Sequence, residues 1–137
     1  MYVPERPKSL VKGRVNVVTI QRGNDEIHIY NVHNHGITRE QIELVKNSID
    51  SKKNYTSKLG GAQTIWLGGD FNFMAGDEIR LRMEGEDEAR DLQRNQNAAR
   101  WKVILQDFTE FCTPEAVTHF DNATSSFSRI DRIYTHT

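Results

Sequence analysis

A polar pair that could act on a phosphate follows a short apolar run in the middle of the chain. Residues 64–67 (TIWL) are mostly β-branched, aromatic or aliphatic, which predicts a buried strand. Two glycines follow, and Asp70 and Asn72 then stand two positions apart, on one face of an extended segment. A carboxylate can accept a proton from water and an amide can hold a phosphoryl oxygen, so the pair suits hydrolysis of a phosphate ester. The alternative is an Asx-turn, in which both side chains cap their own backbone.

Two more predicted strands carry polar residues of similar chemistry. A strand that precedes the first predicted helix ends at His33, and a later strand over residues 127–134 carries Asp131. A carboxylate within a strand is costly to bury unless it has a partner. Asp131 could therefore form a salt bridge with Arg129 or Arg132, or it could orient a catalytic histidine. The candidate site residues are thus His33, Asp70, Asn72 and Asp131.

The elements that must position these residues can be predicted from local patterns. Residues 14–20 and 26–33 alternate like strands around a turn, which predicts an antiparallel hairpin. Thr38 and Gln41 have the spacing of a capping box, so a helix should begin there. Apolar residues then recur at helical spacing, and this helix should pack one face on the sheet: Ile42, Val45 and Ile49.

The second half of the chain predicts another helix and two further strands. An apolar stripe at helical spacing indicates a helix that packs in the core: Trp101, Ile104, Leu105 and Phe108. Strands are expected over residues 116–120 and 127–134, around a polar turn at residues 121–126. Residues 1–9, which contain Pro4 and Pro7, are expected to be a tail or a loop, with the domain over residues 10–137.

The composition is that of an ordinary soluble domain. The 137 residues include 18 basic and 19 acidic side chains, so the net charge of -1 predicts no strong overall attraction to nucleic acid or to a membrane. No apolar stretch is long enough to span a bilayer. The single cysteine, Cys112, excludes an internal disulfide and fits a reducing compartment. We therefore expect an intracellular protein, nuclear or cytoplasmic, without a membrane partner.

Taken in order, several segments resemble motifs of one family. Residues 68–72 (GGDFN), 118–120 (THF) and 128–134 (SRIDRIY) look like motifs of the endonuclease/exonuclease/phosphatase superfamily. Residues 31–33 (NVH) match the strand that ends in a catalytic His or Tyr in that family. The superfamily includes pancreatic-type deoxyribonucleases, abasic-site endonucleases, endonuclease domains of non-LTR retrotransposons and inositol polyphosphate phosphatases. Within the family, residues 118–120 and 128–134 most resemble the corresponding motifs of the retrotransposon endonuclease domains.

The resemblance implies a fold, a reaction and a role for each site residue. The fold would be α/β, part of a four-layered sandwich of two mostly antiparallel or mixed β-sheets flanked by helices. The reaction would be hydrolysis of phosphate esters with Mg²⁺ or Mn²⁺. Asp70 would match the acid-base residue, Asn72 the amide that holds the phosphate, His33 the group that stabilises the pentacovalent phosphorus, and Asp131 the residue that orients a final histidine. Asp70 and Asn72 would also be metal ligands.

The chain also departs from the family pattern. The family supplies an Asn and the main metal-binding Glu from earlier strands, and a catalytic His from a strand after the Arg-Ile-Asp motif, and none of these is found here. His136 is too close to Asp131 in sequence to be that histidine. We therefore expect a C-terminal-half fragment, lacking the N-terminal part and the last strand.

The partners expected from the resemblance are nucleic acid, with DNA favoured, or a phosphorylated small molecule. The missing half of the domain, or self-association through the exposed sheet face, is expected as well. Two other functions stay open: a remnant that binds phosphate or nucleic acid without cleaving it, and a phosphatase of the inositol polyphosphate type.

Overall fold

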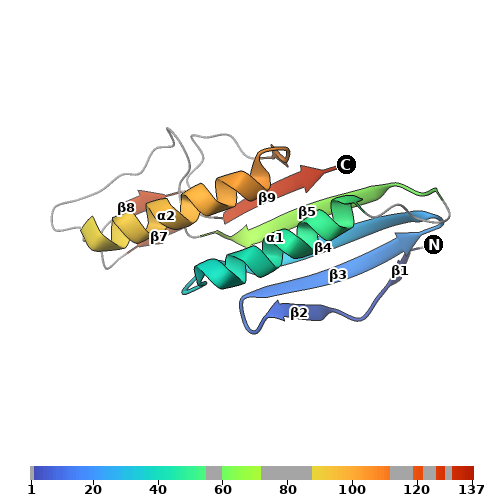
Figure 1. Cartoon of the computed structure of the whole chain (residues 1–137), viewed down its shortest axis with the longest axis horizontal. Helices are drawn as coiled ribbons and strands as arrows, with labels where there is room; N and C mark the ends of the chain where they lie inside the picture. Colours follow the sequence, from blue (N-terminus) through green and yellow to red (C-terminus); the bar gives the residue numbers. More distant parts are fainter. Residues whose placement is uncertain (1, 55–59, 72–87, 112–118, 122–125, 129–130) are drawn as a thin grey trace.

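The structure, a computed structural model, describes residues 2–54, 60–71, 88–111, 119–121, 126–128 and 131–137. Figure 1 shows a sheet that runs along the molecule with two helices packed against it. Asn72 and Cys112 lie outside the described ranges. Within those ranges, no helix combines the length and the apolar character needed to cross a membrane.

The main sheet contains seven strands within the described ranges and has mixed strand directions. Its order is β1, β3, β4, β5, β9, β6, and β2 also pairs with β3. The pair of β4 and β5 is parallel and the other pairs are antiparallel, in agreement with the mixed sheet that the family resemblance implied. The strands are β1 (Tyr2–Pro4), β2 (Lys8–Val11), β3 (Val15–Arg22), β4 (Asp25–His33), β5 (Gln63–Asp70), β6 (Thr109–Glu110) and β9 (Asp131–His136).

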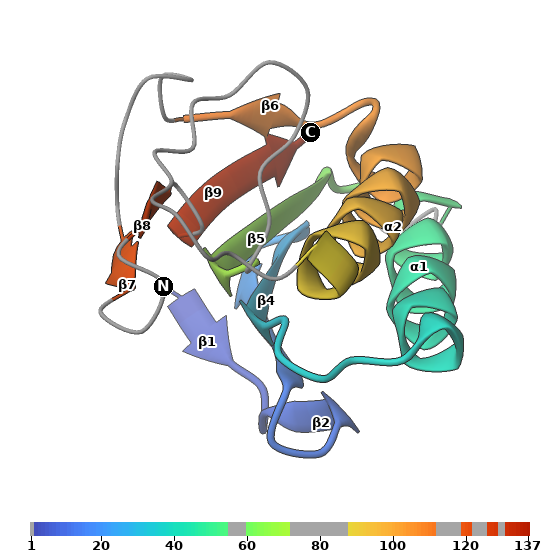
Figure 2. The ribbon, with the colours of Figure 1, turned by 90° about the vertical axis from the view of Figure 1, so that its left-hand side faces the viewer.

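Two helices, α1 (Arg39–Asn54) and α2 (Glu88–Leu105), lie on the same side of the main sheet (Figure 2). The first of them connects β4 to β5, as a crossover between parallel strands must. Apolar side chains fill the space between the helices and the sheet. Because successive side chains of a strand point to opposite faces, every second residue faces the helices and the others face the side that no described helix covers. This core includes Val15, Val17, Tyr30, Val32, Ile65, Leu67 and Tyr134 from the strands, and Ile42, Val45, Ile49, Trp101 and Ile104 from the helices.

The capping box predicted at the start of α1 is confirmed. The backbone N–H of Gln41 donates to Thr38 Oγ1 at 3.2 Å, and the backbone N–H of Thr38 donates to Gln41 Oε1 at 2.9 Å. These two bonds satisfy N–H groups that the first helical turn leaves without partners. The predicted hairpin is confirmed too, because β3 and β4 pair from Val15 with Val32 to Arg22 with Asp25.

The first nine residues differ from the expectation of a tail or loop. Strand β1 lies there and β2 begins there, and both pair with β3: Tyr2 lies opposite Arg22, and Lys8 opposite Val17. Proline misled the prediction because it cannot donate to a strand ladder, yet Pro4 occupies the end of a short edge strand, where it is tolerated. Whether the domain boundary falls at residue 10 stays a prediction.

The single strand predicted over residues 127–134 was wrong, because two strands lie there. The first, β8 (Ser126–Ser128), forms a small separate sheet with β7 (His119–Asp121), and β9 begins at Asp131 in the main sheet. The sequence could not separate them because both carry the same alternating pattern. Residues 116–118 and 129–130, which the prediction also covered, lie outside the described residues.

Candidate active site

Three of the four predicted site residues lie side by side in the main sheet. The register places His33 opposite Asp70 across β4 and β5, and Asp70 opposite Asp131 across β5 and β9. Neighbouring strands are about 4.8 Å apart, so this row spans about 10 Å. It lies where β4 and β5 end and β9 begins, at one end of the sheet (Figure 1). The fourth predicted residue, Asn72, falls outside the described residues.

His33 and Asp70 belong to the sheet face that the helices do not cover. Along β4, Val32 points to the helices and is buried, and the next residue, His33, is exposed. Along β5, Ile65 and Leu67 are buried under the helices, whereas Asp70, an odd number of positions further on, is half-buried on the other side. A dissolved substrate can therefore reach both groups.

Gly69 sets the backbone position immediately before Asp70. It has φ of 132°, and a Cβ placed there would lie 2.1 Å from the carbonyl oxygen of Val32. No other residue fits so close to the neighbouring strand without a shift of the backbone. Gly68 differs, because a Cβ there meets nothing nearer than 3.9 Å. Of the two adjacent glycines, only Gly69 is therefore required by the close approach of the neighbouring strand.

Asn34 fixes the chain on the other side of Asp70, and sequence reasoning missed it. Its backbone N–H donates to the carbonyl of Asp70 at 2.7 Å, and its side-chain Nδ2 donates to the carbonyl of Phe71 at 2.5 Å. The Asn34 side chain is buried, and within the described residues its Oδ1 has no hydrogen-bond partner. The sequence contains no local signal for this role, because the hydrogen-bond partners of Asn34 are 36 and 37 residues away.

Phe71 anchors the same segment to the core. Its ring is fully buried and meets Trp101 edge-on at 5.2 Å and Tyr134 edge-on at 5.4 Å between ring centroids. Such edge-to-face contacts add to the free energy of burial. The residue after Asp70 is therefore held by α2 and β9 together, and this limits how far the Asp70 backbone can move.

Two exposed histidines lie at the tip of β4. The backbone N–H of His33 donates to the carbonyl of Arg14 at 2.7 Å, which fixes the end of the strand. The rings of His33 and His35 are nearly parallel, with centroids 6.0 Å apart. Only His33 belongs to the row with Asp70, because β4 ends there.

The structure gives Arg132 a partner and leaves the pairing of Asp131 open. The Arg132 side chain is buried, and its Nη1 donates to Glu110 Oε1 at 3.3 Å and to Tyr134 Oη at 3.4 Å. Arg129, the other proposed partner of Asp131, lies outside the described residues. Neither the salt-bridge role nor the orienting role of Asp131 is therefore decided by these contacts.

His136 lies on the same strand as Asp131, at the other end of β9. Its Nε2 lies 3.3 Å from Asp107 Oδ2, and the same carboxylate accepts two hydrogen bonds from Lys53 Nζ. The Lys53 bond holds the pKa of Asp107 below its ordinary value. This cluster joins α1, the turn after α2 and β9, and it is remote from the row.

A complete metal site does not form from the described residues. No group of three or more His, Cys, Asp or Glu side chains among them could hold an ion. Mg²⁺ often binds one or two carboxylates and keeps several waters, so Asp70 suits it as a single ligand. Further ligands would have to come from residues beyond those described.

The comparisons with known proteins concern the fold. No protein-family model and no curated protein matches the chain. Among solved structures, the endonuclease domain of TRAS1, a telomere-specific non-LTR retrotransposon, matches with a TM-score of 0.58 and 18% identity, over 97% of this chain and 53% of that chain.

Two further solved structures are less similar. An endonuclease/exonuclease/phosphatase family protein from Leptotrichia buccalis has a TM-score of 0.48 and 13% identity, over 90% of this chain and 42% of that one. The inositol polyphosphate 5-phosphatase domain of SPsynaptojanin has a TM-score of 0.46 and 12% identity, over 98% of this chain and 55% of that one. The chain thus spans about half the length of the structures that it matches. Its fold is that of the TRAS1 endonuclease domain, as expected from the resemblance to the endonuclease/exonuclease/phosphatase superfamily.

Proposed function

We propose that this chain carries part of a phosphoesterase site that hydrolyses phosphodiester bonds in nucleic acid, preferably DNA. The observation that carries the proposal is the row of His33, Asp70 and Asp131 across three neighbouring strands. These residues are far apart in the sequence, and the sheet register brings them together. The likeness to a domain described as an endonuclease supports the same reaction class.

The chemistry of the row follows from the residue types. The Asp70 carboxylate would accept the proton of the attacking water, or return it to the leaving oxygen. The His33 ring, exposed one strand away, would donate a hydrogen bond to a phosphoryl oxygen as negative charge grows there. Asn72 would hold a second phosphoryl oxygen, and Asp131 would orient a catalytic histidine.

We propose Mg²⁺ or Mn²⁺ as the cofactor, with Asp70 and Asn72 as ligands. A divalent ion would polarise the phosphate and stabilise the leaving oxygen when it is bound.

The proposal is tested by nicking of supercoiled plasmid with the purified chain. We expect nicked product with Mg²⁺ and none with EDTA. Asp70→Asn keeps the shape of the side chain but removes the proton acceptor, so it should lower the rate by roughly a thousandfold.

Asp50→Asn is the matched control for Asp70→Asn. Asp50 lies on α1, where it pairs with Lys46 on the surface, so its replacement should leave nicking unchanged. Equal loss of nicking in both variants, or full activity in Asp70→Asn, would contradict the assignment. Circular dichroism of each variant checks that it folds.

A second function, binding without hydrolysis, is favoured by one observation. The described residues contain no group of three metal-binding side chains, and a catalytic unit that lacks members loses most of its rate. A folded chain that binds an oligonucleotide in the presence of Mg²⁺, but does not nick plasmid, would support this function over the first.

A further inference from the structure

The loop that follows β4 connects two strands of the candidate site through one residue. The register of β4 with β5 ends where His33 lies opposite Asp70. The next residue, Asn34, continues the contact: its backbone N–H donates to the Asp70 carbonyl at 2.7 Å, and its side-chain Nδ2 donates to the Phe71 carbonyl. The residue next to His33 therefore binds two successive carbonyl groups, of which the first belongs to Asp70.

These two hydrogen bonds require a bend at the end of β5. In an extended strand, successive carbonyl groups point to opposite sides, so only every second one faces a given neighbour. The carbonyls of Asp70 and Phe71 both face Asn34, so the chain is no longer extended at Phe71, in agreement with the end of β5 at Asp70. The Asn34 side chain supplies the second donor, which the backbone of one residue cannot supply.

Asn34 is itself held in a fixed position. The backbone N–H of His35 donates to the His33 carbonyl at 2.9 Å, which closes a tight turn centred on Asn34. The Asn34 side chain is 4% exposed, and Ile37, further along the loop, is buried to the same extent. The loop is thus anchored at two points, and the His33 and His35 side chains remain exposed.

The orientation of the Asn34 amide follows from its partner. A carbonyl only accepts, so the atom that faces the Phe71 carbonyl is Nδ2 and the other atom is Oδ1. Oδ1 is buried, and among the described residues it has no donor. A buried acceptor without a donor costs free energy, which offsets part of what the Nδ2 bond contributes to stability. Stability alone therefore gives little reason for an asparagine here, whereas its place between His33 and Asp70 gives a functional reason.

We propose that Asn34 is a positioning residue, which holds the Asp70 carboxylate at a fixed place relative to the His33 ring. This inference rests on the proposed function, in which Asp70 transfers a proton and His33 binds a phosphoryl oxygen. Asn34 does not touch the substrate and acts through the backbone of Asp70 and Phe71. A displacement of a reacting group by about 1 Å lowers the rate by about a hundredfold. Because proton transfer belongs to the chemical step, the loss should fall on kcat rather than on KM.

Asn34→Asp tests the proposal, because it keeps the shape of the side chain but replaces the donor by a carboxylate oxygen. That oxygen would face the Phe71 carbonyl, and two acceptors without a hydrogen between them repel each other. At about pH 8, we expect kcat for plasmid nicking to fall by about 30–100-fold, with KM changed by less than about threefold.

Acid should restore part of the activity of Asn34→Asp. A carboxyl group buried beside a carbonyl ionises less readily than an exposed one, and in its protonated form it donates a hydrogen bond again. The ratio of the two kcat values, variant over original, should therefore rise from about pH 8 to about pH 6. The groups around the loop that titrate are His33, His35 and Asp70, and Arg14 is a fixed charge. Both proteins contain these groups, so the ratio removes their effect.

Two further variants complete the comparison. Asn34→Ala removes the donor without adding a charge, so it should lower kcat without any recovery in acid. Asn47→Asp is the matched control, because it makes the same exchange at an exposed position of α1 and should leave nicking unchanged. Urea unfolding of each variant identifies conditions in which all of them are folded, so that a loss of activity is not a loss of folded protein.

Hydrogen exchange of the backbone amides tests the positioning without any reaction. In the original chain, the hydrogen bond to the Asp70 carbonyl should protect the amide of residue 34. After correction for intrinsic rates, Asn34→Ala should accelerate exchange of this amide by about tenfold more than exchange of the Leu67 amide in the interior of β5.

Four outcomes would overturn the proposal: an Asn34→Asp variant with the original kcat, a loss confined to KM, no recovery in acid, or no additional acceleration of exchange at residue 34. An original chain that does not nick plasmid would contradict the proposed hydrolysis instead. In that case the exchange measurement still decides whether Asn34 holds the end of β5.

Discussion

At the scale of single residues, the two adjacent glycines before Asp70 make the most specific prediction. Gly69→Ala should lower the free energy of unfolding by about 2–4 kcal/mol, because the new methyl group meets the Val32 carbonyl and φ of 132° strains a residue with a Cβ. Gly68→Ala should change it by less than about 1 kcal/mol, since the space is open. Urea unfolding of both variants measures the difference. Equal losses of stability in the two variants would mean that the Val32 carbonyl on β4 does not lie against Gly69 on β5.

Asn34 supports a second prediction at this scale. Asn34→Ala removes the hydrogen bond from Nδ2 to the Phe71 carbonyl in a buried setting, so it should cost about 1–3 kcal/mol in the free energy of unfolding. Asn31→Ala is the control, because Asn31 is exposed and lies two positions before His33 on β4, on the sheet face that the helices do not cover. If Asn34→Ala is as stable as Asn31→Ala, the chain after Asp70 is held by other contacts.

Site residues could be predicted from the sequence where residue type and position in a strand identify them, but not where a contact between distant residues does. His33, Asp70 and Asp131 could be named because each falls at a predicted strand end or within a strand. Asn34 could not, because a hydrogen bond to a residue 37 positions away has no local signature. The roles of Asn72 and Asp131 stay predictions.

At the scale of elements, a buried histidine links three strands and makes stability depend on pH. His28 on β4 is fully buried; its Nδ1 lies 2.8 Å from Thr19 Oγ1 on β3, and its Nε2 lies 2.6 Å from Gln63 Oε1 on β5. Burial lowers the pKa of His28, and the Gln63 hydrogen bond offsets this only in part. The neutral ring therefore fits the folded state.

The direction of the pH effect follows from this pKa. Unfolded His28 binds a proton below about pH 6.5, whereas folded His28 binds one only at lower pH. The unfolded state thus takes up more protons in that window, so the free energy of unfolding should fall as the pH drops below about 6.5. Urea unfolding at several pH values between about 5 and 7 measures the slope.

His28→Gln is the variant that identifies the group responsible for the slope. It removes the titrating ring, so stability should fall less steeply with acid than in the original chain. The pKa of Asp107 is lowered as well, but its contribution is lost only at more acidic pH, as that carboxylate becomes protonated. A slope that survives His28→Gln unchanged would assign the effect to another group.

Elements were predictable where the sequence carries a pattern or a cap. The hairpin of β3 and β4 and the capping box of α1 rest on local signals, and the structure confirms them. The stripe of α2 is confirmed for Trp101, Ile104 and Leu105, whereas Phe108 packs against the core from beyond the end of the helix. The edge strands β1 and β2 were missed, because they exist only through pairing with β3. The division into β8 and β9 was missed for the same reason, because the sheet to which each strand belongs depends on the distant strand that pairs with it.

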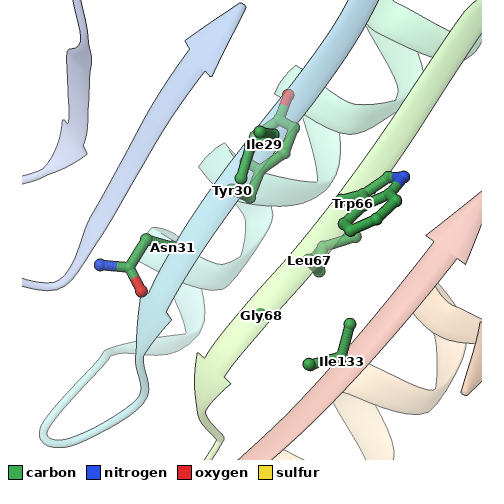
Figure 3. A pocket seen from close by; sticks show the side chains of 7 residues that line it. All are labelled: Ile29, Tyr30, Asn31, Trp66, Leu67, Gly68 and Ile133. Carbon is green, nitrogen blue, oxygen red and sulfur yellow. The ribbon is translucent and has the colours of Figure 1, made fainter. Parts of the chain in front are cut away.

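At the scale of the whole molecule, the sheet order creates the candidate site. β9 comes last in the chain but lies beside β5, and this placement brings Asp131 next to Asp70. No local pattern specifies that neighbour. The resemblance to a known family implied it, and the fold shared with the TRAS1 endonuclease domain agrees. The hollow lined by Ile29, Trp66 and Ile133 likewise depends on three strands, β4, β5 and β9, being aligned in register (Figure 3).

The central claim is that His33 and Asp70 form one site that takes a phosphodiester, and NMR of the histidine rings tests it most directly. His33→Ala assigns the His33 signals, and His28 and His136, at the other end of the sheet, are internal controls. Adding a dinucleotide with Mg²⁺ should shift the His33 signals and leave those of His28 and His136 in place. Asp70→Asn should weaken this response. Equal shifts at all three histidines, or none at His33, would contradict the account.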